Sequence, residues 1–472
     1  MNRVYRLLFV ALGLVLPALS SALAKPNIVL IYIDDYGWRD VGFNGTKFYE
    51  TPNADRIARE GMIFRSAYSN GPNCAPSRAC LMSGLYSPRH GIYTVANSDR
   101  GKASLRKIIP TKNTTVLADE FVTMAEALKM GGYTTAMMGK WHLGKDPTTQ
   151  GFDINIAGRE WGSPSGGGYH SPYKYPNLVN KQKGEYLTDR LGSEAAKFIE
   201  AHKDKPFFLY LTHYAVHTPI QAKPELTSKY QKKPTVDQQT NAKYAAMIES
   251  MDDSVGTVLE TLDRLKLADN TIVVFYSDNG GHAGATSNAP LRGSKGMLYE
   301  GGIRVPMAVR WPGVAKAGSV CEEPVIGIDL YPTLLEATKT KRPAKAQLDG
   351  TSLVPLLKDA QARLFRPALY WHFPAYLQGS TRRHGPFRTT PAGAVRMGDW
   401  KLIEYFDDGT LELYNLANDI GETGNLAKQQ PKKTARLHAM LKAWRRATDA
   451  PVPTEMNPRF DSEAWRKATR KR

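Results

Sequence analysis

Two pairs of oxygen-bearing side chains each follow directly after a predicted strand, although the pairs lie far apart in the sequence. Asp34-Asp35 follows the apolar, β-branched run at 27–33, and Asp278-Asn279 comes just after the similar run at 271–276. Three carboxylates and an amide carbonyl suit Ca²⁺ or Mg²⁺ better than Zn²⁺, which prefers His and Cys ligands. The structural alternative is that Asp35 and Asp278 cap helices or turns. Because both pairs lie at strand ends, the sequence favours one divalent-cation site.

Two lysine-bearing loops could bind an anion. Lys140 and His142 lie two residues apart in GKWHLG, after the predicted strand at 133–138, and can converge on one anion. The segment LRGSKGMLYEGGIRVP contains Lys295 between glycines, which let the backbone approach a ligand closely. Taken alone, the first segment fits a solvated turn better and the second fits a mobile glycine-rich loop better, so both depend on the accompanying segments.

Two histidines follow the predicted strand at 206–212 in the segment HYAVHTP. A histidine at a strand exit can protonate a leaving alkoxide, because its pKa lies near neutral pH. We expect His217 to have this kind of role and His213 to be a structural group.

The segment CAPSRACLMSG places Cys74 four residues before Arg78 and ends at Gly84. By itself it also fits a Pro-Ser turn that runs into a helix with a buried cysteine. Short motifs of this kind match by chance, so the interpretation depends on the accompanying segments.

The segments CAPSRACLMSG, GKWHLG, SDNGGH and LRGSKGMLYEGGIRVP occur in that order. Together they resemble the type I, formylglycine-dependent sulfatases of the alkaline phosphatase superfamily. HYAVHTP and Asp34-Asp35 agree with this resemblance, which covers nearly all of the chain after residue 24. It implies that a formylglycine-generating maturation enzyme oxidises Cys74 to an aldehyde, and that the aldehyde hydrate attacks sulfate esters.

The resemblance also implies a role for each polar residue. The cation, Ca²⁺ with Mg²⁺ as the alternative, would be bound by Asp34, Asp35, Asp278, Asn279 and the formylglycine made from Cys74. Arg78 and Lys140 would hold the hydrate, and His142 would support it. His217 and Lys295 would bind the sulfate near its leaving oxygen.

An aldehyde hydrate suits this reaction because one carbon carries two hydroxyls. One hydroxyl attacks sulfur and expels the alcohol, and the second collapses the sulfated hemiacetal by breaking its carbon–oxygen bond. A serine could accept the sulfate but could not release it in this way.

The sequence predicts an α/β fold for the strands and helices that must position these residues. Buried strands at 27–33, 133–138, 206–212 and 271–276 alternate with helical stretches, including 121–130 and 243–266. This alternation predicts a large, mostly parallel mixed sheet flanked by helices, with ligands beyond the carboxyl ends of the strands. A glycine- and aromatic-rich stretch at 155–184 is expected to be a long loop over the site.

The pattern changes after about residue 357. Short strands at 368–372, 394–397, 400–405 and 410–414, followed by a helix at 431–448, predict a smaller antiparallel sheet with a helix. The basic end, 466–472, is expected to fray. The predicted organisation is a signal peptide at 1–24, a catalytic domain at 25–357 and a C-terminal α+β subdomain at 358–472.

The first 24 residues combine a basic start, a short apolar run and Ala22-Leu23-Ala24, which predicts a secretory signal peptide and a secreted or periplasmic protein. A membrane anchor is the alternative, but the run is short and contains Pro17. No later segment is expected to span a membrane. With three cysteines there is no disulfide framework, and whether Cys80 pairs with Cys321 stays open.

The formal net charge of +18 is compatible with nucleic acid, anionic membranes or acidic polymers. A sulfated carbohydrate fits both the charge and the predicted compartment, and we expect no nucleic-acid partner. The resemblance favours exo-acting sulfatases of galactose-like or hexosamine sugars. Candidate sugar contacts are Trp161, His170, His372, and one of Arg382, Arg383 or His384. Each of them fits a surface loop or the core at least as well.

Two other functions remain to be separated from this one. A phosphatase or phosphodiesterase of the same superfamily would carry Ser or Thr as nucleophile and bind two transition metals with histidine ligands. An inactive polyanion-binding protein would be expected to have lost one of the polar residues, and none is missing.

Overall fold

The computed structural model describes residues 25–470, so the predicted signal peptide lies outside the described residues. Its largest element is an eight-stranded sheet in the order β5-β4-β6-β1-β7-β8-β2-β9. The first five strands of that order run parallel, and β8 runs antiparallel to both of its neighbours. In sheet order the strands are Ile154–Ile156, Thr134–Gly139, Phe207–Thr212, Asn27–Ile33, Thr271–Ser277, Met307–Arg310, Met62–Phe64 and Ser319–Cys321.

Strand β1 lies between β6 and β7, and all seven of its residues are buried. Its side chains alternate between two cores, because successive residues of a strand point to opposite faces. Val29 and Ile31 join the core on the side of α5 and α7, whereas Ile28 and Leu30 join the core on the side of α4 and α9. A strand buried on both faces reads as a continuous apolar run, which is the pattern seen in the sequence.

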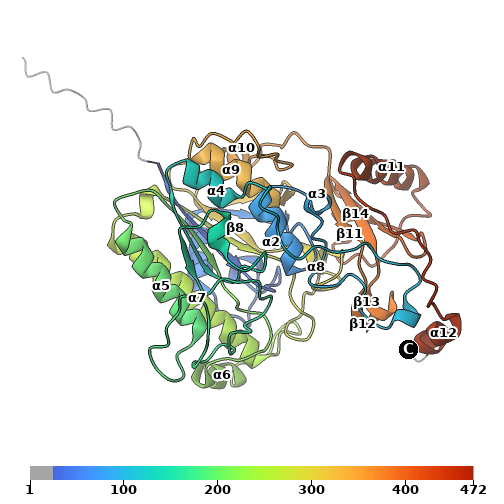
Figure 1. The fold of residues 1–472 in the computed structure, drawn as a ribbon, viewed down its shortest axis with the longest axis horizontal. Helices are drawn as coiled ribbons and strands as arrows, with labels where there is room; N and C mark the ends of the chain where they lie inside the picture. The colour runs from blue at the N-terminus through green and yellow to red at the C-terminus, as the bar shows by residue number, and fades with distance from the viewer. Residues whose placement is uncertain (1–24, 471–472) are drawn as a thin grey trace, which may run out of the picture.

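Helices therefore cover both faces of the sheet (Figure 1). One face packs against α1 (Pro52–Glu60), α5 (Leu187–Ala201) and α7 (Ala242–Arg264). The other packs against α2 (Cys74–Ser83), α4 (Met124–Met130), α9 (Leu330–Ala337) and α10 (Val354–Lys358). The remaining short elements of this part are α3 (Ser87–His90), α6 (Pro224–Gln231), α8 (Glu300–Ile303) and the strand pair β3 (Ala67–Tyr68) and β10 (Val325–Ile326).

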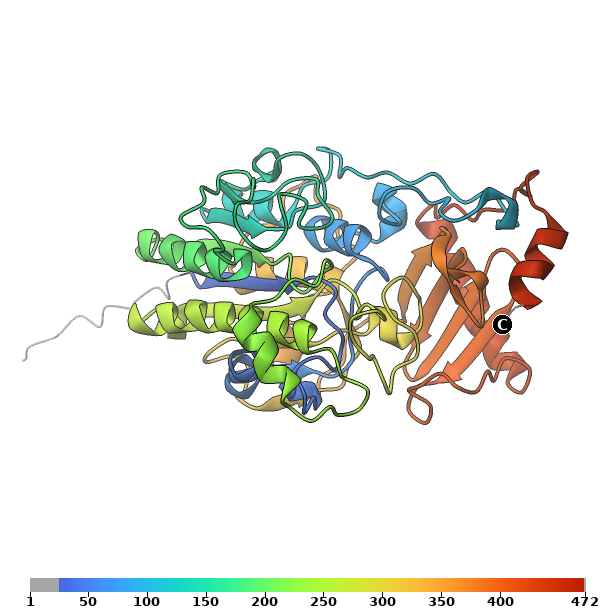
Figure 2. The same cartoon turned by 90° about the horizontal axis from the view of Figure 1, so that it is seen from below.

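The C-terminal part forms a separate antiparallel sheet beside the carboxyl-end side of the large one, as Figure 2 shows. Its order is β11-β14-β15-β16, and a hairpin of β12 and β13 stands next to it. Helix α11 packs on the sheet through Leu437 and Leu441. The bounds of β11 to β16 are Leu369–Phe373, Leu377–Thr381, Gly385–Thr389, Ala392–Met397, Trp400–Tyr405 and Leu411–Asn415; those of α11 and α12 are Pro431–Ala447 and Ser462–Arg470.

The predicted fold class is confirmed, with a few corrections of detail. The prediction of a frayed tail is wrong over most of its length, because α12 continues to Arg470 and Trp465 stacks on Phe387 at 6.2 Å between ring centroids. Cys80 and Cys321 are buried free thiols and do not pair. The boundary at 357/358 stays a prediction. Within residues 25–470, none of the helices has both the length and the apolar character needed to cross a membrane.

Candidate active site

The predicted polar residues meet where four neighbouring parallel strands end. Asp34 follows β1, Asp278 follows β7 and Lys140 follows β4. The register explains the convergence, since Ile33 pairs with Ser277 and Gly139 pairs with Thr212. Side chains that leave the same edge of a sheet must lie close together, and ligands of α/β sheets bind at this edge.

Cys74 reaches the same place from the first residue of α2. Pro76 fits the first turn, where its missing N–H breaks no helical bond. The Ser77 hydroxyl donates to the Gly71 carbonyl and accepts from the Gly71 N–H, each at 3.0 Å, which fixes the loop before the helix. Gly84 ends the helix at a φ of 71°, and its N–H donates to the Cys80 carbonyl. The motif therefore forms one buried helix that ends at Gly84.

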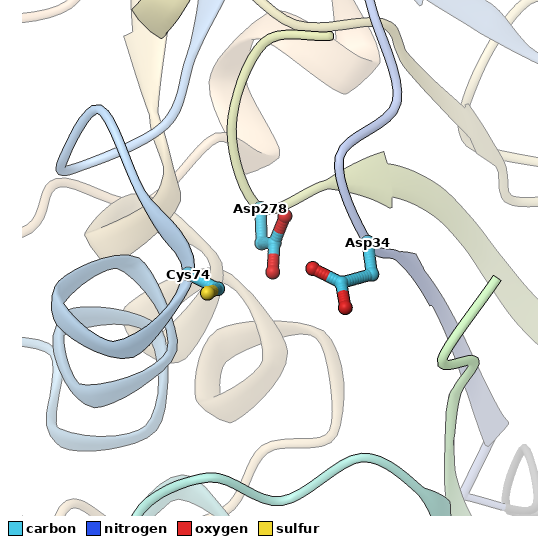
Figure 3. A group of neighbouring side chains, drawn as sticks. All are labelled: Asp34, Cys74 and Asp278. Carbon is cyan, nitrogen blue, oxygen red and sulfur yellow. The ribbon is translucent and has the colours of Figure 1, made fainter. Parts of the chain in front are cut away.

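Figure 3 shows Asp34, Cys74 and Asp278 facing one space from three different elements. One possible ligand atom from each of the three lies within 4.8 Å of the others. All three side chains are buried. A group of this kind is compact enough for a single cation.

Each site carboxylate meets a different cation. The pairs are Asp34 with Lys140 at 2.6 Å, Asp278 with Arg78 at 2.7 Å, and Asp35 with Lys295 at 2.7 Å. The Arg78 guanidinium is fully buried and also donates to the Thr212 hydroxyl and to the Lys140 carbonyl. Three negative and three positive groups thus balance one another around Cys74.

The site fits the predicted divalent cation. Asp34 Oδ1 and Asn279 Oδ1 are buried and have no hydrogen-bond partner among residues 25–470. Buried acceptors without partners are costly, and a cation would satisfy both. Burial and the neighbouring Asp34 raise the pKa of Asp278 to about 7, which is the signature of carboxylates crowded together. The Asp278 Oδ1 atom accepts the Asp35 N–H at 3.1 Å.

Cys74 is poorly suited to act as a thiolate here. Burial raises the pKa of its thiol, so the unmodified side chain is protonated at neutral pH. Because the thiolate is the nucleophilic form, an unmodified Cys74 would be a weak nucleophile.

Both predicted functional histidines border the site. His142 adopts a left-handed backbone conformation at a φ of 65°, and its ring lies against Gly162. His217 Nε2 lies 3.7 Å from Asp35 Oδ2, while its Nδ1 is 2.6 Å from the Thr218 carbonyl. Burial, followed by the charge of Lys295, lowers the pKa of His217 to about 3. His213 is fully buried against Ser254, as expected of a structural histidine.

A pocket of about 790 Å³ opens above Cys74, and His142, His217 and Lys295 line it. The loop at 155–184 supplies part of its wall through Trp161. The structure thus brings the predicted reactive cysteine to a cavity large enough for a sugar ring or more.

The other five predicted sugar contacts lie elsewhere. His372 is buried between Tyr93 and Phe406, and His384 is buried against Tyr405. Arg383 is held by an ion pair with Glu412 at 2.8 Å. His170 lines a different surface depression, and Arg382 is exposed and does not line the pocket above Cys74. Of the six candidates, Trp161 alone lines that pocket.

The pocket also contains side chains that the sequence reasoning did not single out. They are Arg100, Lys145, Glu160, His282, Gln378 and Arg388. His282 stands inside the quoted SDNGGH segment and could have been found there. Arg388 belongs to β13 of the C-terminal part, and nothing in the local sequence connects it with Cys74.

Comparison with known proteins agrees with this arrangement. A family model described as Sulfatase matches residues 26–340, and a second, described as N-sulphoglucosamine sulphohydrolase, C-terminal, matches residues 294–447. A sulfatase of Formosa agariphila is 35% identical over 92% of this chain and 91% of its own length. Human N-acetylgalactosamine-6-sulfatase is 34% identical over 77% of this chain and 72% of its own length.

A solved structure shares the fold over almost the whole chain. The crystal structure of Ps i-CgsB in complex with k-i-k-neocarrahexaose has a TM-score of 0.75 and 30% sequence identity, and the match covers 95% of this chain and 98% of that one. The family match and the close relatives together show that this chain belongs to the sulfatase family, within the alkaline phosphatase superfamily, and is a sulfuric ester hydrolase.

Proposed function

We propose that this chain removes sulfate groups from sulfated carbohydrates, using a formylglycine made from Cys74 and one bound Ca²⁺. The observation that carries the proposal is the position of Cys74, which lies at the start of α2, lines the pocket, and comes within 4.8 Å of possible ligand atoms of Asp34 and Asp278. Its protonated, buried thiol argues for a modified side chain in the working enzyme.

Some of the residues around Cys74 would act on the nucleophile, and others would act on the sulfate. When present, the aldehyde hydrate supplies a nucleophilic hydroxyl and a second hydroxyl that allows sulfate release. When bound, the cation supplies positive charge that neutralises a sulfate oxygen and polarises sulfur. Asp34, Asp35, Asp278, Asn279 and the modified Cys74 would hold that cation.

Three cationic side chains and two histidines would act on the same groups. Arg78 and Lys140 lie on the Cys74 side and would orient the hydrate, with His142 beside them. Lys295 and His217 line the pocket, where they would bind the sulfate and protonate the departing alcohol oxygen. Charges that are fixed in place before the reaction need no reorganisation as the negative charge shifts.

A carbohydrate substrate is supported by the pocket and by the relatives. The pocket has room for a sugar, and Trp161 offers an aromatic wall. One relative is named for N-acetylgalactosamine 6-sulfate and one solved structure contains a hexaose. We therefore favour galactose-like or hexosamine sugars, cleaved in an exo manner. The predicted signal peptide supports a secreted or periplasmic enzyme, and a formylglycine-generating enzyme would be its maturation partner.

The test combines product detection with mass spectrometry. Sulfate release is measured on defined sulfated mono- and disaccharides, with the matching phosphate esters as controls. The peptide that spans Cys74 should be about 18 Da lighter than its unmodified form, the difference between a thiol and an aldehyde at that carbon. Faster phosphate release would favour the phosphatase alternative, and full activity with only unmodified Cys74 would refute the formylglycine mechanism.

A further inference from the structure

Two arginines from distant parts of the chain line the pocket above Cys74. Arg100 belongs to the segment that follows α3, and Arg388 belongs to β13. Both side chains are half-buried. The pocket wall that they form therefore joins the catalytic part of the chain to the C-terminal hairpin.

Packing around two glycines holds these arginines in place. Gly101 lies so close to the Phe387 ring that an added Cβ would come within 2.7 Å of it. The Tyr376 N–H donates to the Ser98 carbonyl at 2.8 Å, which ties the same segment to the hairpin. Arg100 and Arg388 are the direct neighbours of Gly101 and Phe387 in the chain, so this contact brings the two arginines to one side of the pocket.

The second glycine places Arg388 beside the sulfate-binding lysine. A Cβ on Gly296 would lie 3.0 Å from Cδ of Arg388, so the arginine stem runs along the residue that follows Lys295. The Gly296 N–H donates to the Pro72 carbonyl at 2.6 Å, two residues before Cys74. Arg388 thus stands next to the predicted position of the sulfate.

Neither arginine has a carboxylate partner. Within residues 25–470, no ion pair involves Arg100 or Arg388, although Arg100 Nη2 donates to the Val95 carbonyl at 2.8 Å. The adjacent Asp99 is bound to Arg106 instead. The pocket is lined by one acid, Glu160, which is paired with Arg159 at 2.9 Å.

The absence of a carboxylate ion pair within residues 25–470 distinguishes Arg100 and Arg388 from the cations around Cys74. Arg78, Lys140 and Lys295 are each neutralised by an aspartate. Burial lowers the pKa of both Arg100 and Arg388, and the charge of Arg388 lowers that of Arg100 further; the charge of Asp35, which is itself paired with Lys295, opposes the effect on Arg388 only in part. Two half-buried like charges are unfavourable unless an anion compensates them. A guanidinium binds sulfate and carboxylate oxygens well, because its N–H groups match their geometry.

We propose that Arg100 and Arg388 form a second anion subsite, which binds a sulfate or carboxylate group carried by the substrate beside the sulfate that is cleaved. This inference rests on the proposed function and narrows the substrate to saccharides with at least two anionic groups. The enzyme would then discriminate by charge pattern as well as by sugar identity.

The experiment compares matched substrates and matched variants. The substrates are a monosulfated disaccharide, the same disaccharide with a second sulfate, the same with a uronate carboxylate, and an aryl sulfate whose only charge is the sulfate that is cleaved. The variants are Arg100→Gln, Arg388→Gln and the double variant. Arg382→Gln is the control, because this exposed arginine removes one positive charge from the same hairpin without lining the pocket.

The wild-type enzyme should prefer a substrate with a second anion by about tenfold or more in kcat/KM, the scale of one or two charge-assisted hydrogen bonds. Whether the second sulfate or the carboxylate gives the higher kcat/KM identifies the anionic group that the subsite binds. Each single variant should lower this preference mainly through KM, and the double variant should abolish it. Arg382→Gln should keep it. Losses that are equal on all four substrates, or a wild-type enzyme without the preference, would overturn the subsite.

A binding measurement separates this proposal from the proposed function. Cys74→Ala protein is titrated by calorimetry with the intact two-anion disaccharide, with and without Arg388→Gln. Weaker binding in the combined variant supports the subsite even if no sulfate release is ever found. Equal binding refutes the subsite even if the enzyme is an active sulfatase.

Discussion

At the scale of single residues, the buried oxygens of Asp34 and Asn279 that accept no hydrogen bond within residues 25–470 are the strongest sign of a cation. Asp278→Ala should therefore remove the bound metal and lower activity by about a hundredfold or more. Elemental analysis of the purified protein should find one Ca²⁺ per chain, and a chelator should lower its melting temperature. Asp252→Asn is the control, because this buried aspartate binds Asn53 and Ala54 away from the site. Stoichiometric zinc, or full activity of Asp278→Ala, would contradict the prediction.

A second prediction concerns the proton that the leaving alcohol needs. Burial disfavours the charged form of Lys295. The negative charge of Asp35 nevertheless raises the pKa of Lys295, so this lysine is protonated at neutral pH. His217, with a pKa lowered to about 3, is neutral in this structure and would need the charge of the substrate to take up a proton. Both remain candidates for the general acid, because the bound sulfate changes both environments.

Lys295→Ala and His217→Ala distinguish acid catalysis from sulfate binding. A sugar alkoxide is a poor leaving group and needs a proton, whereas a nitrophenolate scarcely does. Loss of the general acid should therefore slow sugar sulfates at least about tenfold more than activated aryl sulfates. If both variants lose the same factor on both substrates, the two residues only bind sulfate.

At the scale of elements, the pairing of β4 with β6 sets where Lys140 and His142 emerge. Gly139 ends β4 at a φ of 115°, and a Cβ there would come within 1.9 Å of the Thr212 carbonyl oxygen. Gly139→Ala should therefore separate the strand ends, cost about 3 kcal/mol or more in the free energy of unfolding, and lower kcat. Thermal unfolding and sulfate release measure the two effects.

Gly132 is the matched control for this substitution. It also has a positive φ, of 84°, but no atom lies within 4 Å of its added Cβ. Gly132→Ala should cost only the backbone strain, about 1 kcal/mol, and should leave kcat unchanged. If both variants unfold alike, the contact with Thr212 does not control the strand ends.

At the scale of the whole molecule, the sequence predicted the four central strands β4, β6, β1 and β7, because they are long apolar runs that end in polar residues, and it missed the shorter strands β5, β8, β2 and β9. The roles of Arg78 and Lys295 came from the resemblance, since no periodicity indicates that these side chains meet. Arg100 and Arg388 escaped detection because the hairpin folds back over the pocket through long-range packing. The sequence could not decide between a sugar contact and a core position for His372 and His384 for the same reason, since burial by distant aromatic rings leaves no local signal.

A buried ionic cluster joins the two parts of the molecule. Lys401 of β15 contacts Glu300 of α8 and Glu422, each at 2.9 Å, and all three side chains are fully buried. Burial acts against the charge of both acids. Lys401 nevertheless lowers the pKa of Glu300 to about 2, whereas the pKa of Glu422 is raised to about 7. Since α8 lies in the glycine-rich segment that carries Lys295, this cluster also anchors the site.

The two acids therefore predict opposite effects of pH on stability. The lowered pKa of Glu300 adds stability above its unfolded value near 4.5, and this contribution is lost as the pH falls toward about 2. The raised pKa of Glu422 adds stability only while the group is protonated, and this contribution is lost as the pH rises through about 7. The ionised form of Glu422 therefore destabilises the folded state at alkaline pH.

Glu422→Gln should remove this destabilisation, and its amide oxygen can still accept the hydrogen bond from the Glu300 N–H. At pH 8 its melting temperature should equal or exceed that of the wild type, and the difference should vanish near pH 5, where Glu422 is protonated. Lys401→Met should instead leave buried Glu300 with only its longer ion pair, to Arg304 at 3.4 Å, and cost about 3 kcal/mol. Thermal unfolding of the three proteins between pH 5 and pH 8 checks both expectations. A Glu422→Gln protein that is markedly less stable than the wild type at pH 8 would show that the ionised acid supports the junction between the two parts.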